Sequence, residues 1–277
     1  MARWSPGVAF VWCLSVSSIT GAADDDRPSI ERLKLMEQEV AQLAATSAQI
    51  ASPQALKFAA KPLLRYSDPT RGLTAENVLM DATVWRLGQQ GRPTALVTLE
   101  IYRRSDTQGV LSFEFLSLSQ QRFSMQHRQH PHITWDANES ALTLKPLPEA
   151  PQPAGTAPAR LVQMRQLAKR FTVNEKLVTG ETVVCRMLSQ PIDRYQAPAE
   201  QIADGALFAF ANGTNPEIGL IFEADDARWS YALVRLSAAE VTVLLDDRPA
   251  AHFPLSDSFR LKSGSYISGN HAVELPQ

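Results

Sequence analysis

The chain has 277 residues, of which 44% are hydrophobic and 20% charged, and its formal net charge is −2. These values are typical of a globular protein with a sizeable core, and they exclude a disordered or fibrous chain. No basic stripe or polybasic segment is present, which argues against nucleic acid and against an anionic membrane surface as partners.

Residues 1–23 have the order of a secretory signal peptide. Arg3 precedes the apolar run 8–16, and small residues at 20–23 come before three aspartates. The apolar run is about half of the roughly 20 residues that a membrane-spanning helix needs. We therefore expect cleavage after Ala22 or Ala23, a mature protein in the periplasm or outside the cell, and no membrane span in the mature chain.

The first element of the mature chain is predicted to be a helix over about 29–48. Its apolar residues Leu33, Met36, Val40 and Leu43 recur at spacings that place them on one helix face. The following segments are short, rich in β-branched and aromatic residues, and separated by turn residues, which is typical of strands. These segments are 82–87, 94–102, 111–119, 123–127 and 133–135. Their short connections favour antiparallel pairing.

A proline-rich stretch, 146–158, is predicted to be a semi-extended linker, because proline cannot continue a strand ladder. Beyond it the chain resembles its own first part. A shift of 128 places the apolar face of the first helix on Leu161, Met164, Ala168 and Phe171, which predicts a second helix over about 158–172. The same comparison aligns 62–69 with 191–198, and the residues from Asp81 with those from Asp204.

The fold class predicted from this self-similarity is α+β, a tandem duplication of one helix followed by about five or six antiparallel strands. The expected divisions are a signal peptide (1–23), a first unit (24–145), the linker (146–158), and a second unit with a C-terminal tail (159–277). Each unit could close its own sheet over its own helix. We favour the alternative, one joined, curved sheet with both helices on its concave side, because one helix covers a six-stranded sheet poorly.

At the paired motifs the chain resembles uncharacterised exported proteins of planctomycete bacteria. The residues that carry this resemblance are 65–69 with 91–102, and 191–195 with 204–217. That group has no activity to transfer. A weaker resemblance is to periplasmic lipoprotein carriers, whose half-barrel has a similar order of proline, Arg-aromatic pair, proline and Asp-Gly turn. This chain has that order between Pro191 and Phe208, but the spacings differ and Ala82 replaces the glycine in the first unit.

Polar residues that occur in both units are the first candidate binding residues: Arg65 and Arg194, Tyr66 and Tyr195, Asp81 and Asp204, with Glu100 and Glu223. Two carboxylates meeting between the units could perform acid–base chemistry. The alternative is structural, since an aspartate at a strand start can bond turn amides and an arginine can pair while its stem packs on an aromatic ring. We expect the structural role.

The second candidate is the group His127, His130 and His132. Imidazoles are common ligands of zinc and copper. Pro131 indicates a turn, the ligand set is incomplete, and the second unit has Arg248 and Ala250 at the matching places. We therefore expect no metal ion and no other cofactor.

Cys185 lies in an apolar run, where a cysteine usually packs as a small hydrophobic residue. No motif typical of a nucleophilic serine, a phosphate loop or a zinc protease occurs. The sequence therefore favours a non-catalytic exported binding or assembly module that uses the concave sheet face or the groove between the units. An apolar ligand or an envelope protein is the expected partner. The alternative is a hydrolase or metal-dependent enzyme of the cell envelope.

Overall fold

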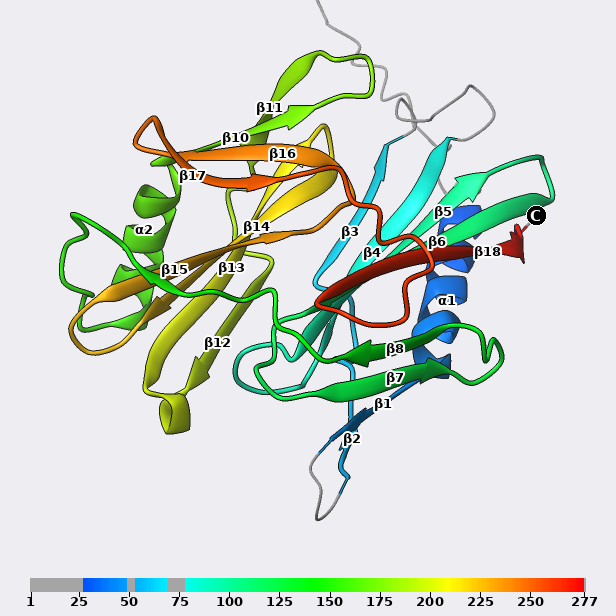
Figure 1. Ribbon diagram of the computed structural model, residues 1–277, viewed down its shortest axis with the longest axis horizontal. Helices are drawn as coiled ribbons and strands as arrows, with labels where there is room; N and C mark the ends of the chain where they lie inside the picture. The colour runs from blue at the N-terminus through cyan, green and yellow to red at the C-terminus, as the bar shows by residue number, and fades with distance from the viewer. Residues whose placement is uncertain (1–26, 49–52, 69–77, 277) are drawn as a thin grey trace, which may run out of the picture.

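The computed structural model describes residues 27–48, 53–68 and 78–276, so the expected signal peptide lies outside the described residues (Figure 1). The helices are α1 (Arg27–Gln42) and α2 (Ala157–Ala168), with a short 3-10 turn at Pro198–Glu200. Both helices end earlier than the sequence predicts. Leu43 and Phe171, expected on the apolar helix faces, are instead the first residues of strands. β1 follows α1 directly, and a two-residue turn separates β10 from α2.

The sheets contain all the strands that the sequence predicts, and more. Those before α2 are β1 (Leu43–Ser47), β2 (Ala55–Leu56), β3 (Leu64–Asp68), β4 (Leu79–Leu87), β5 (Ala95–Arg103), β6 (Gln108–Ser117), β7 (Phe123–His127), β8 (Thr134–Ala137) and β9 (Lys145–Pro146). Those after α2 are β10 (Phe171–Lys176), β11 (Thr182–Met187), β12 (Asp193–Ala197), β13 (Ile202–Asn212), β14 (Asn215–Ala224), β15 (Trp229–Arg235), β16 (Glu240–Leu245), β17 (Arg248–Phe253) and β18 (Tyr266–Glu274). All pairings between these strands are antiparallel, which confirms the α+β class and the predicted sheet type.

Strands pair in the same order in the first half of the molecule (α1 to β8) and in its second half (α2 to β17). The order β2-β1-β7-β8 corresponds to β11-β10-β16-β17, and β3-β4-β5-β6 corresponds to β12-β13-β14-β15. The register agrees as well, since Tyr66 lies opposite Ala82 and Tyr195 opposite Gly205, each beside an irregularity in the ladder. The two halves thus share element order, pairing and register.

The halves are not joined into one sheet, and the favoured arrangement of the sequence analysis is wrong on this point. Strands of the first half lie in a four-stranded and a five-stranded sheet, and strands of the second half in a nine-stranded sheet. What connects the halves is an exchange of edge strands. The linker strand β9 pairs with β15 of the second half, and the C-terminal strand β18 pairs with β6 of the first half along nine residues. Both exchanges involve segments that the sequence analysis treated as linker and tail.

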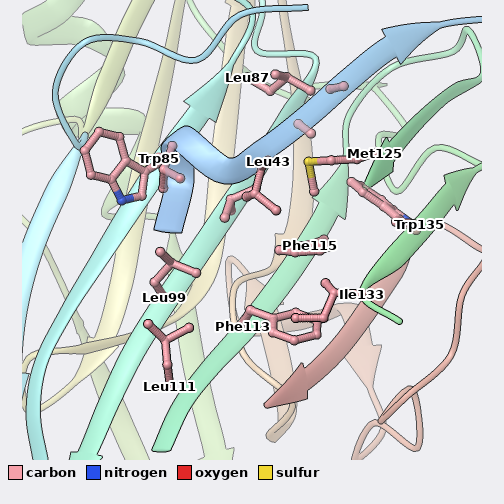
Figure 2. Close-up of a cluster of buried hydrophobic side chains, with 14 of the residues drawn as sticks. Leu43, Trp85, Leu87, Leu99, Leu111, Phe113, Phe115, Met125, Ile133 and Trp135 are labelled. Atoms are coloured by element: carbon pink, nitrogen blue, oxygen red, sulfur yellow. The ribbon is translucent and has the colours of Figure 1, made fainter. Parts of the chain in front are cut away.

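Each half has its own apolar core between its helix and its sheet. In the first half, Met36 and Val40 of α1 pack with the inner face of the sheet, where Trp85, Phe115 and Trp135 are almost fully buried (Figure 2). In the second half α2 packs in the same way, and Cys185 is 4% exposed within that core, which confirms its predicted burial. The sheet face that each helix covers is therefore packed with apolar side chains.

A third core joins the two halves. Leu96 and Leu116 of the first half pack against Leu207, Ile221 and Val234 of the second half. Alternate residues of β5, β13 and β14 therefore point into two different cores, and these strands are buried on both faces. The outer faces of the two helix-bearing units thus meet in the middle of the molecule.

Candidate metal centre

The candidate residues Arg65 and Asp81 bind each other and hold α1. Arg65 Nε donates to Asp81 Oδ1 at 2.9 Å, and its Nη2 donates to the carbonyl oxygen of Ser29 in the first turn of α1 at 2.7 Å. Arg32 of the same helix lies 3.4 Å from the Asp81 carboxylate. We call this group the first helix anchor.

The second half has the same arrangement. Arg194 Nε and Arg160 Nε each lie 3.0 Å from the carboxylate of Asp204, and Arg194 also donates to the carbonyl oxygen of Ala157 at the start of α2. Asp204 is 1% exposed. We call this group the second helix anchor. In both halves the aspartate accepts from arginines rather than from turn amides, so these residues fasten a helix to a sheet.

The paired tyrosines bind the paired glutamates. Tyr66 donates its hydroxyl to Glu100 at 3.0 Å, and Tyr195 donates to Glu223 at 2.7 Å. Burial, and next the adjacent carboxylate, raise the pKa of both tyrosines above its ordinary value, so the hydroxyls remain protonated donors. Glu223 also accepts from Arg92, which crosses from the first half. The candidate acids are therefore engaged in local ion pairs and hydrogen bonds.

Glu114 is a further carboxylate at the contact between the halves. Burial is the largest effect on its pKa and raises it, and the neighbouring carboxylates of Glu100 and Glu217 raise it further. The nearby Tyr266 hydroxyl and the charge of Arg235 lower it, but the pKa of Glu114 stays well above the ordinary value of 4.5. The folded protein therefore retains a proton here that the unfolded chain releases.

We expect the variant Glu114→Gln to become more stable relative to the wild type as pH rises. Above the unfolded pKa the unfolded chain has lost the proton, so the free energy of unfolding of the wild type falls by up to about 1.4 kcal/mol per pH unit until the folded pKa is passed. Urea unfolding of both proteins at pH 4.5 and pH 8 measures this. The exposed Glu139→Gln serves as the control, and a constant difference between wild type and Glu114→Gln at both pH values would contradict the expectation.

The histidines lie in a cluster that sequence analysis saw only in part. We call Glu39, His127, His130, His132 and His271 the histidine–glutamate cluster. His127 Nε2 lies 3.0 Å from Glu39 Oε2, and His271 Nε2 lies 3.3 Å from the same oxygen. The His130 ring centroid is 4.4 Å from that of His271, and the more exposed His132 ring is 5.8 Å from His130. Three of the five histidines of the chain thus lie around one carboxylate, and a fourth, His132, lies beside His130.

His127 holds the carboxylate of Glu39 in place. Its Nδ1 accepts backbone N–H groups of Gln129 and His130, at 3.2 and 3.0 Å. A nitrogen that accepts two N–H groups carries no proton, so the proton of the neutral ring is on Nε2 and points at Glu39. His127 is therefore a hydrogen-bond donor to Glu39, and its Nε2 lone pair is not available to a metal ion in this tautomer.

His271 is placed differently. Its Nε2 lies 3.3 Å from Glu39 Oε2 and its Nδ1 lies 3.3 Å from the carbonyl oxygen of Ala272, so each ring nitrogen faces an oxygen acceptor. A ring nitrogen bonded to a backbone carbonyl is the usual support of a metal-binding histidine. The side chains of His271 and Glu39 are only 10% and 13% exposed. A cation bound by both would take the place of the proton between His271 Nε2 and Glu39.

The charge states of the cluster suit a cation. Burial raises the pKa of Glu39, but hydrogen bonds and charges of His271 and His127 outweigh it, so the pKa lies below its ordinary value. Burial lowers the pKa values of His127 and His130. It outweighs the charge of Glu39, which raises both, so both pKa values lie below their ordinary values. Both directions favour a charged Glu39 and neutral rings at His127 and His130. Ligand atoms of Glu39, His127 and His130 lie within 4.8 Å of one another, the one such group found among the described residues, and His271 adjoins it through Glu39.

Sequence analysis missed Glu39 and His271. Glu39 stands beside Val40, on the buried side of α1. A search for regularly spaced apolar residues does not detect a carboxylate at the edge of an apolar helix face. His271 lies on β18, which was treated as tail. Glu39 and His271 add to the ligand set that is incomplete when only His127, His130 and His132 are considered.

No family model, curated protein or solved structure matches this chain. Among the described residues no helix has the length and apolar character needed to cross a membrane.

Proposed function

We propose that the protein is an exported binding module for a divalent transition-metal ion, held by Glu39, His130 and His271, with His127 orienting Glu39. The observation that carries this proposal is the convergence of His127, His130 and His271 on the largely buried carboxylate of Glu39. Imidazole and carboxylate together are ligands of zinc and copper. His132, exposed and adjacent to His130, stands where an entering ion would first be bound.

A comparison with the other half supports a specific role for the cluster. The residues at the matching places are Leu167 for Glu39, Leu245 for His127, Arg248 for His130 and Ala250 for His132. Leu167 and Leu245 are 5% and 8% exposed and belong to one apolar core. The second half closes this region with apolar side chains, so the fold does not require buried polar groups there. Buried polar groups usually reduce stability unless all their hydrogen bonds are made.

We also infer that the halves arose by tandem duplication, which the matching strand order, register and helix anchors support. The cluster then marks the place where the halves diverged. The expected signal peptide supports a site of action outside the cytoplasm, where a metal ion binds after export.

The proposal predicts one Zn²⁺ bound per chain of the tag-free mature protein, measured by isothermal titration calorimetry. Losing a ligand should weaken binding by about 100-fold or more, since loss of a supporting residue alone typically costs 10–100-fold. His130→Ala and His271→Ala test this. His252, the exposed fifth histidine, provides the control, and His252→Ala should bind as the wild type does. Absence of stoichiometric binding, or wild-type affinity in His271→Ala, would refute the proposal.

A further inference from the structure

The three proposed ligands come from segments that are far apart in the chain. Glu39 lies in the last turns of α1, His130 in the turn between β7 and β8, and His271 in β18 near the C-terminus. A bound ion would link the N-terminal helix to the C-terminal strand. Links that close long loops restrict the unfolded or opened chain most.

The helix α1 buries fewer residues than β18 does. β18 is paired with β6 along nine residues and buries Ile267 and Val273, so it is fixed without the ion. The helix α1 buries only Met36 and Val40 fully, and the first helix anchor acts at its N-terminal end. Its C-terminal end is held by Glu39 and its histidine partners and by Arg128, whose Nη1 donates to the carbonyl oxygen of Ala41 at 2.8 Å. The chain then continues directly into β1, which pairs with β7.

The second half shows what replaces the cluster when no ion is involved. There α2 buries three side chains, Met164, Leu167 and Ala168. Beyond its end, Arg170 pairs with Asp246 at 3.0 Å. The C-terminal end of α2 is therefore closed by apolar packing and an ion pair that need no added ligand.

We propose that the metal ion, bound reversibly, holds α1 closed over the core of the first half. We call this role the metal tie. This inference rests on the proposed function. With the ion bound, Glu39 is fixed to His271 and His130, and α1 covers Trp85 and Leu99. When the ion is removed, the C-terminal end of α1 opens more often, while α2 is unaffected. The exposure of the first apolar core thus depends on the concentration of free metal ion.

The size of the effect follows from mass action. If only the closed form binds, free metal at 100 times Kd lowers the population of the open form about 100-fold. Amide hydrogen exchange that proceeds through this opening should slow by the same factor. The expected change is confined to residues 31–42, and the amides of α2 at residues 159–168 are an internal control.

Hydrogen exchange of the full mature protein, with Zn²⁺ and after chelation with EDTA, tests the inference. Protection of α1 should be gained with Zn²⁺, lost on chelation and regained on adding Zn²⁺ again. His252→Ala should behave as the wild type, and His271→Ala should show no response. Because chelation acts on the unmodified protein, a variant that fails to fold does not prevent the test.

Calorimetry on the same samples separates the two proposals. If Zn²⁺ binds stoichiometrically and the amide hydrogen exchange of α1 is unchanged, the proposed metal tie is refuted and the metal-binding function stands. If Zn²⁺ does not bind, the proposed function itself fails. Equal protection of α1 and α2 would also overturn the tie, because it would indicate general stabilisation rather than closure of one helix.

Discussion

Replacing Asp204 by alanine should lower the free energy of unfolding by about 3–5 kcal/mol, the usual result of removing one partner from a buried ion pair. Asp204 is 1% exposed and is the carboxylate that both Arg194 and Arg160 approach. Without it two guanidinium groups lose their counter-charge at the junction of helix and sheet. For a protein of this size each kcal/mol corresponds to about 2–4 °C in melting temperature.

Asp81→Ala should have a similar effect, because Arg65 and Arg32 face Asp81 in the first half. Thermal and urea unfolding of both variants measure the loss. The exposed Asp226→Ala is the matched control and should change stability by less than about 0.5 kcal/mol. If either anchor variant kept wild-type stability but lost a ligand or an activity, the aspartates would belong to a binding site and their structural role would be rejected.

Local elements of this fold can be predicted because their signals lie close together in the sequence. The spacing of Met36 and Val40 gives the buried face of α1, and both are buried as expected. The segment 123–127 is strand β7 with the predicted bounds. Helix ends could not be placed, because Leu43 continues the helical spacing while its backbone pairs with His127 of β7. A tertiary contact overrides the local pattern there.

Long-range pairing could not be predicted, because no local signal specifies a partner. The segment 266–274 contains Ser268, Gly269 and Asn270, which weaken its strand pattern. Gly269 has a tertiary reason, since a Cβ atom there would lie 2.4 Å from the Phe113 ring. The sequence therefore presents β18 as a tail, although it completes the sheet of the first half.

The candidate site was found in part for the same reason. His127 and His130 are close in sequence and were recognised together, and the ring centroids are 4.7 Å apart. Glu39 and His271 join them only through the packing of α1 and β18. Repetition in the two halves, by contrast, identified residues that support both helices. In this protein the arginines and aspartates present in both halves form the helix anchors, the tyrosines and glutamates present in both halves bind each other, and the candidate metal site consists of residues that the other half lacks.

Removing β18 by ending the chain at Gly264 should prevent the first half from folding. The strand pairs with β6 from Tyr266 to Glu274 and, with the residue after it, buries Ile267, Val273 and Leu275 in the first core. Each such side chain contributes about 1.5–3 kcal/mol when buried, so their sum is comparable with the whole net stability of a protein, about 5–15 kcal/mol.

Circular dichroism and limited proteolysis of the truncated protein measure this loss, and a chain lacking only its last two residues is the control. Truncation also exposes the edge of β6, so the shortened protein should self-associate. Adding a peptide of residues 262–277 in trans should restore protection of the first half, because the nine-residue ladder then forms between two chains. A truncated protein with native stability and protease resistance would show that β18 is dispensable, and the exchange of edge strands would then not be what unites the halves.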